Sequence, residues 1–296
     1  MGLSLLHIGD LTGARAHLDR AIALYDPAEH RSLASRFGQD VGAASLAWRS
    51  LALWLLGYPE DAVADAERAI RVAREDGHSP TLGYTLNFCV LQHSLSGDFG
   101  AADPLIDELI TVKDQTGGRS WGGWATLQRG SLLALIGKSS AAVETIAGGV
   151  AAIRSTANTM WIPLWLSFLA KAKGETGQFD GARGDIADAM ITAETTKERW
   201  CEAEVYRTAG EIELLSPGAD PNRAEAYFAR ALEIARKQQT KSWELRAATS
   251  LARLWRSQGK RRQAHDLLFG VHRWFTEGLD TIDLKTSKQM LEKLAR

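Results

Sequence analysis

A spacing of about forty residues recurs along this 296-residue chain and constrains its fold more than any other feature. The reference positions are glycines separated by 48, 40, 40, 40 and 82 residues: Gly9, Gly57, Gly97, Gly137, Gly177 and Gly259. Ala219 divides the last interval into 42 and 40. An alanine stands five residues after every reference position: Ala14, Ala62, Ala102, Ala142, Ala182, Ala224 and Ala264. Twelve residues after it the side chains are mostly small: Ala21, Ala69, Leu109, Gly149, Ala189, Ala231 and Val271. Trp121, Trp161 and Trp243 stand sixteen residues before it.

Helix geometry explains this pattern. Positions seven residues apart lie on one face of a helix, and small side chains there let two helix axes approach closely. The reference glycine ends the preceding helix, where a left-handed conformation costs least. Residues just beyond it are predicted to cap the next helix: Asp10, Asp98, Ser139 and Asp180. Because a single helix pair cannot bury its apolar face, the pairs must stack. The repeat therefore predicts an all-α fold, a right-handed α-solenoid of about seven helix pairs.

The same register predicts how the chain is organised. We expect residues 1–296 to form one superhelical domain, with a truncated first repeat at 1–25 and repeats two to seven at 26–275. Residues 276–296 are predicted to form a closing helix, with Asp283 as its cap. Its apolar residues would cover the last exposed edge of the stack: Leu284, Met290, Leu291 and Leu294.

A glycine turn followed by alanines at these two offsets resembles the tetratricopeptide repeat, with a period nearer 40 residues than the usual 34. Several stretches resemble a more particular family, the C-terminal repeat region of large bacterial signalling proteins. They are GQDVGAASLAW at 38–48, ERWCEAEVYRTAGEIEL at 198–214, KSWELRAATSLARLWRSQGKRRQAHDLL at 241–268 and WFTEGLDTIDLK at 274–285. In that family the region follows a signalling ATPase module of the AAA or STAND type. That module is often preceded by a class III adenylate or guanylate cyclase domain, or by a DNA-binding domain. Gly122 and Gly123 depart from the family, which tends to carry larger apolar residues there.

The first repeat is shorter than the others. Only eight residues precede Gly9, whereas the other repeats have about 18 available for their first helix. Leu3, Leu5, Leu6 and Ile8 would leave an apolar face open. We therefore expect further structure before Met1. The family resemblance implies that this structure would include the catalytic and ATPase modules.

Composition narrows the class of protein. Apolar residues make up 45% and charged residues 24%, as in an ordinary globular protein, and no apolar run approaches the roughly 20 residues that span a bilayer. Cys89 and Cys201 lie far apart, which favours reduced, buried thiols and a cytoplasmic location. Residues 222–296 carry 16 Lys and Arg against 8 Asp and Glu, a net charge of +8 in a chain whose total is −1. A solvated helical surface explains this excess better than a nucleic-acid partner does.

Known catalytic and cofactor motifs are not found. Gly137-Lys138-Ser139 has the ending of a phosphate-binding loop, but Leu132 stands where that loop needs its first glycine. The segment therefore reads as a helix ending at a turn. Neither the seven histidines nor the two cysteines show metal-ligand spacing, and no nucleophile elbow is present. We predict no catalytic residues, no cofactor and no metal.

What remains is a binding surface. The first helix of each pair should line the concave groove of the solenoid, at positions about thirteen, ten, six and three residues before the reference position. These positions hold Trp54, Tyr84, Asn87, Trp124, Lys171, Tyr206, Arg246, Arg253 and Arg256. Aromatic residues with arginine are typical of recognition surfaces. The alternative for the aromatic residues is helix packing.

Together these features predict a non-catalytic interaction scaffold or sensor, without a membrane partner. It would bind a protein, peptide or small effector and regulate an attached or neighbouring ATPase or cyclase. One alternative is a fragment of a cyclase-type enzyme that lacks its catalytic domain. The other is a regulator associated with nucleic acid through its basic C-terminal repeats.

Overall fold

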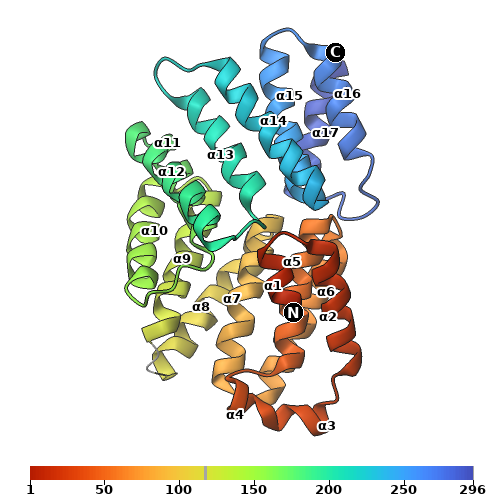
Figure 1. Ribbon diagram of the computed structural model, residues 1–296, viewed down its shortest axis with the longest axis vertical. Coiled ribbons are helices and arrows are strands. Elements are labelled where there is room, and N and C mark those ends of the chain that lie inside the picture. Colours follow the sequence, from red (N-terminus) through yellow and green to blue (C-terminus); the bar gives the residue numbers. More distant parts are fainter. Residues whose placement is uncertain (117–118, 296) are drawn as a thin grey trace. The chain divides into compact units, whose positions relative to one another are not determined.

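The chain is built from helices alone wherever the structure describes it. The computed structural model describes residues 1–116 and 119–295, and every regular element within these ranges is helical (Figure 1). The predicted all-α class is confirmed. The structure divides into two compact units.

Unit 1 comprises Met1–Leu6, Asp10–Trp54 and Pro59–Asn158. The helices that lie wholly or mainly in it are α1 (Gly2–His7), α2 (Leu11–Leu24), α3 (Pro27–His30), the 3-10 helix η1 (Arg31–Leu33), α4 (Ala34–Phe37), α5 (Val41–Leu56), α6 (Pro59–Asp76), α7 (Ser79–Ser96), α8 (Phe99–Thr116), α9 (Arg119–Leu135) and α10 (Ser139–Arg154). Helix α7 packs against both α8 and α9, and α9 packs against α10. The pairs thus stack in chain order, as the repeat predicts.

Unit 2 comprises His7–Gly9, Leu55–Tyr58 and Thr159–Arg296. Its helices are α11 (Ile162–Glu175), α12 (Phe179–Thr196), α13 (Glu202–Leu215), α14 (Pro221–Gln238), α15 (Lys241–Ser257), α16 (Arg261–His272) and α17 (Ile282–Ala295). The first helices of successive pairs form one layer, because α11 packs on α13, α13 on α15 and α15 on α17. The second helices, α12, α14 and α16, each pack on the helix before them (Figure 1). That the two units make a single domain stays a prediction.

The reference glycines are the turns between paired helices. All six have φ between 79° and 94°, the left-handed region that glycine adopts without steric cost. A recurring hydrogen bond closes the turn: the residue after the glycine donates its N–H to the carbonyl five residues earlier. In the α7–α8 turn Asp98 donates to His93 at 2.9 Å, and in the α9–α10 turn Lys138 donates to Leu133 at 2.8 Å. The Gly137-Lys138-Ser139 segment is such a turn, between two helices. In the sixth repeat the left-handed residue is Gly218, one position before Ala219.

The alanine series marks the helix crossings. All seven alanines at the +5 position are 0% exposed. At the +12 position the residues from the second repeat onward are buried, and only Ala21 in α2 is exposed. Of the recurring tryptophans, Trp161 and Trp243 are buried, and the side chain of Trp121 lies outside the described residues.

Two of the four predicted caps are confirmed. The carboxylates of Asp10 and Asp98 accept hydrogen bonds from the N–H groups of Gly13 and Ala101, at 2.9 and 3.2 Å. Ser139 and Asp180 are not caps, because α10 and α12 begin at or before them. The capping position is the residue directly after the left-handed glycine, which in these two turns is Lys138 and Gln178.

The closing helix is α17, and it packs against α15 and α16. Leu284, Met290 and Leu294 are buried, and Leu291 is partly buried against the same core. Asp283 is not the cap of this helix, which begins at Ile282. Its carboxylate lies in the first turn and accepts a hydrogen bond from Nε of Arg246 at 2.7 Å. Asp283 therefore belongs to the surface described next.

Candidate recognition surface

One face of α13 carries a row of alternating charges. Glu204, Arg207 and Glu211 are spaced by three and four residues, so they lie on the same side of the helix. Both oxygens of Glu204 accept from the guanidinium of Arg207, at 2.7 and 2.8 Å, and Glu211 accepts from it at 3.2 Å. The side chain of Glu204 is 4% exposed. Arg207 is thus held in a fixed orientation by the two carboxylates.

The row continues onto α15 and α17. Ser250 donates its hydroxyl to Glu211 at 2.6 Å, and Arg253 Nη1 lies 3.3 Å from the same carboxylate. Arg246 lies between Glu204, 3.6 Å away, and Asp283 of α17, 2.7 Å away. Charged groups from three first-position helices therefore form one connected network, which we call the α13–α15 network.

The network's charges stabilise one another. Burial raises the pKa of the Glu204 carboxyl, but the positive charges of Arg207, Arg246 and Lys171 outweigh burial and hold it below its ordinary value. Burial also opposes the charge on Arg207, yet Glu204 and Glu211 raise the pKa of its guanidinium. Both residues are therefore ionised at neutral pH.

The outer edge of the network is open to solvent. The side chain of Arg253 is 51% exposed, and Arg256, three residues later on α15, is also exposed. The side chain of Arg256 forms no ion pair with any other residue that the structure describes. Lys171 of α11 pairs with Glu175 on its own helix. Two arginines on adjacent turns of one helix thus present guanidinium groups outward.

Four of the nine predicted groove residues contribute to this surface: Lys171, Arg246, Arg253 and Arg256. Tyr206 does not. Its ring is 6.4 Å from that of Tyr227 of α14 and 5.9 Å from the guanidinium of Arg230. Tyr206 therefore packs against the second helix of its own pair.

The remaining predicted residues lie in unit 1 and form no surface together. Trp54 and Asn87 are 2% and 6% exposed, and the side-chain oxygen of Asn87 accepts from Gln128 at 3.0 Å. Tyr84 accepts from the indole N–H of Trp48 at 3.0 Å, and burial raises the pKa of its phenol. Trp124 is half-buried on α9. Since Trp54 and Asn87 offer almost no area to a partner, the proposed surface leaves them out. Helices α5 and α7 are buried around most of their circumference, and polar residues of α7 such as Asn87 are buried too, so the sequence pattern could not identify an outward face.

The acidic half of the network was missed in the sequence analysis. In the sequence, Glu204 and Glu211 each have another glutamate two residues away, Glu202 and Glu213, which lies on a different face of the helix. The useful signal was the 204–207–211 spacing of alternating charge.

No protein-family model matches the chain, and no curated protein matches it. Solved structures do. A Rap protein in complex with Competence and Sporulation Factor matches with a TM-score of 0.68 and 12% identity, over 99% of this chain and 85% of that one. A STAND signal-transduction ATPase with a tetratricopeptide repeat sensor, from Pyrococcus horikoshii, matches with a TM-score of 0.50 and 10% identity, over 90% of this chain and 42% of that one. BtubC from P. vanneervenii matches with a TM-score of 0.50 and 16% identity, over 79% and 88%.

The chain has a tetratricopeptide-like fold. In this tetratricopeptide-like chain, the α13–α15 network lies on the first helices of successive pairs, the helices that the repeat predicts to line a groove.

The network's chemistry suits recognition. The side chains of Arg207, Arg246 and Arg253 are each paired with a carboxylate, and arginine held in a fixed orientation is well suited to bind a further carboxylate. Both cysteines are buried, and burial raises the pKa of each thiol. Across residues 1–116 and 119–295, no His, Cys, Asp and Glu side chains gather as a metal site requires. None of the described helices has the length and apolar character needed to cross a bilayer.

Proposed function

We propose that this chain is a non-catalytic recognition module that binds an acidic peptide or protein segment along α13 and α15. The observation that carries this proposal is the pair of outward guanidinium groups on α15, Arg253 and Arg256, beside a fixed network. Glu211 orients Arg253 from the adjacent helix, which lowers the entropy cost of binding. A carboxylate-bearing segment would pair with both arginines.

The similar structures support the general class of function. The Rap protein was solved in complex with Competence and Sporulation Factor, and the STAND protein has a tetratricopeptide repeat sensor. We propose that the present chain likewise senses a partner and regulates an ATPase or cyclase module, attached or neighbouring. The physical basis would be a difference in affinity between two states of that module.

Peptide selection tests the proposal. The whole chain would be used to select from a phage-displayed library of random peptides, and the affinity of the selected peptides would be measured by fluorescence anisotropy. We expect the selected peptides to be rich in Asp and Glu. The double variant Arg253→Glu, Arg256→Glu should weaken their binding by about a hundredfold, since two charge-assisted contacts are lost.

The matched control is Arg262→Glu, Arg273→Glu. Both of these arginines are exposed, and the pair changes the net charge by the same amount away from the network. The control should keep the wild-type affinity. Equal losses in the two double variants, or selected peptides without acidic residues, would contradict the proposal.

A further inference from the structure

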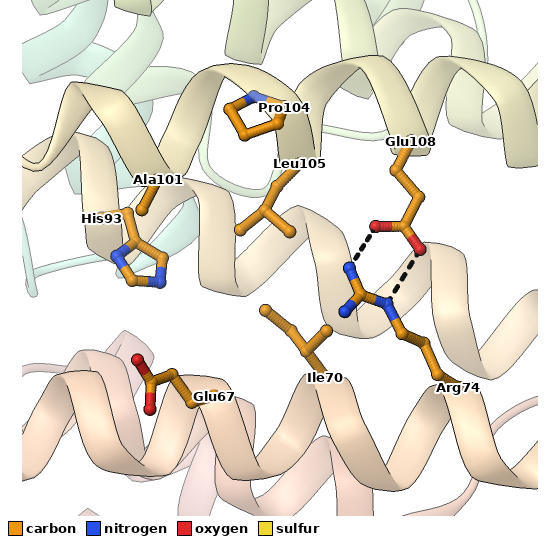
Figure 2. A pocket seen from close by; sticks show the side chains of 8 residues that line it. All are labelled: Glu67, Ile70, Arg74, His93, Ala101, Pro104, Leu105 and Glu108. Carbon is orange, nitrogen blue, oxygen red and sulfur yellow. Dashed lines mark hydrogen bonds and ion pairs between the residues drawn. The ribbon is translucent and has the colours of Figure 1, made fainter.

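A pocket of about 310 Å³ lies among α6, α7 and α8 in unit 1, and none of its lining residues belongs to the α13–α15 network. Figure 2 shows α6 and α8 as facing walls, with side chains from both pointing into the space between them. The lining residues are Glu67, Ile70, Arg74, His93, Ala101, Pro104, Leu105 and Glu108. The two ends of the pocket differ in their electrostatics.

One end is already neutralised. The guanidinium of Arg74 donates to both oxygens of Glu108, at 3.0 and 2.6 Å, and so joins α6 to α8. Between this pair and the other end, the walls are formed by the apolar side chains of Ile70 and Leu105, which face each other in Figure 2. A ligand lying here would be in contact with hydrocarbon.

The other end holds a carboxylate and an imidazole. Glu67 is exposed, and its carboxylate makes no ion pair or hydrogen bond with any residue in the described part of the chain. Figure 2 shows the His93 ring on α7 beside this carboxylate. The His93 side chain is 4% exposed, and its Nδ1 lies 3.5 Å from the carboxylate of Asp98.

These neighbours fix the state of the imidazole. Burial lowers the pKa of His93, although Asp98 and Glu67 act in the opposite direction, so the ring is neutral at pH 7. The Asp98 carboxylate favours the tautomer with its proton on Nδ1, which leaves Nε2 as a hydrogen-bond acceptor. With the charges of Arg74 and Glu108 cancelled, the pocket offers two acceptors, one uncompensated negative charge and an apolar wall.

We propose that this pocket binds a small organic monocation, an ammonium or guanidinium group on an apolar body. The cation would pair with Glu67 and donate a hydrogen bond to His93, while its body lies against Ile70 and Leu105. An anion of the same shape would be repelled by Glu67. A neutral alcohol would gain the apolar contact without the ion pair.

A set of three probes of matched shape tests the proposal on the whole chain. The probes are 2-phenylethylammonium, 2-phenylethanol and 3-phenylpropionate, titrated at pH 7 into isotopically labelled protein and followed by two-dimensional NMR. We expect the ammonium to bind about tenfold more tightly than the alcohol, as one charge-assisted contact implies, and the carboxylate to bind more weakly still.

Variants locate the binding site. Glu67→Gln should reduce the affinity for the ammonium to that of the alcohol. Ala101→Phe should abolish binding by filling the pocket. The control is Glu75→Gln, because Glu75 is exposed on the same helix but does not line the pocket. It should bind like the wild type.

Three results would overturn the inference. They are equal affinity for the ammonium and the alcohol, unchanged binding in Glu67→Gln, and no binding of the ammonium by the wild type. Circular dichroism on each variant shows whether the helices are intact. A loss of binding in both Glu67→Gln and Glu75→Gln would assign the effect to net charge and would also count against the pocket.

Discussion

Glu198 is a buried carboxylate that supports the junction between α12 and α13. It is 3% exposed, and one oxygen accepts from the indole N–H of Trp200 at 2.7 Å. The other accepts from the backbone N–H of Trp161 at 2.8 Å, at a residue whose φ of 69° is left-handed. No cation pairs with it among the residues that the structure describes. Burial raises the pKa of this carboxyl to about 7, against the effect of the two hydrogen bonds.

This raised pKa predicts how stability depends on pH. The pKa of Glu198 is about 7 in the folded chain and near 4.5 in the unfolded chain, so the folded state holds its proton more tightly. Its contribution to the free energy of unfolding is fully present below pH 4.5 and is lost as pH rises through 7. The difference amounts to about 3 kcal/mol.

Glu198→Gln should remove this dependence. The free energy of unfolding in urea, measured from pH 4.5 to 8, should fall less with rising pH in the variant than in the wild type. Exposed Glu292, changed to Gln, is the control for removing a carboxylate. A wild-type-minus-variant difference that is constant across this range would show that Glu198 has no raised pKa.

At the scale of elements, the α9–α10 pair depends on glycine for close packing. The departure at Gly122 and Gly123 does not break the helix, because α9 runs from Arg119 to Leu135. A Cβ on Gly123 would lie 2.8 Å from Ile153 Cδ1, and one on Gly130 would lie 2.6 Å from Ile146 Cγ1. The two helix axes approach closely because these side chains are absent.

Gly130→Ala and Gly148→Ala should therefore have opposite effects. The Cβ at position 130 would also approach the Ile146 backbone nitrogen to 3.0 Å, so overpacking should destabilise the fold by roughly 1–3 kcal/mol. Gly148 is exposed in α10 with nothing within 4 Å of its Cβ, so alanine should stabilise by about 0.5–1 kcal/mol. Chemical denaturation measures both. Destabilisation of equal size in the two variants would contradict the packing argument.

Sequence predicted the elements better than the surface. The glycines predicted the turns, because few other residue types adopt a left-handed backbone conformation. The alanines predicted the helix crossings, because only small side chains let two helices approach closely. No such residue type marks which face of a helix points outward when the helix is buried on most sides. For this reason Trp54 on α5 and Asn87 on α7 were expected on a surface, and both are buried. The α13–α15 network depends on pairs such as Arg246–Asp283, 37 residues apart, and only the fold brings these together.

At the scale of the whole molecule, the proposed non-catalytic function makes a prediction about nucleotide turnover. Gly137-Lys138-Ser139 lies at the turn between α9 and α10, and the buried residue Leu132 stands where a phosphate-binding loop needs glycine. We expect the chain incubated with ATP and Mg²⁺ to release neither phosphate nor pyrophosphate above a protein-free blank. Turnover that scales with protein concentration would contradict a purely non-catalytic module.

The left-handed turns also have a practical use. At Gly137, Gly177 and Gly259 nothing lies within 4 Å of where a Cβ would stand, so the backbone there faces open space. Loop tips of this kind tolerate inserted residues, because no packed side chain has to move. Each turn is thus a place where a fluorescent reporter or a short epitope can be introduced without disturbing the helix crossings. The proposed binding of a partner to α13 and α15 could then be followed from Gly259, two residues after the end of α15.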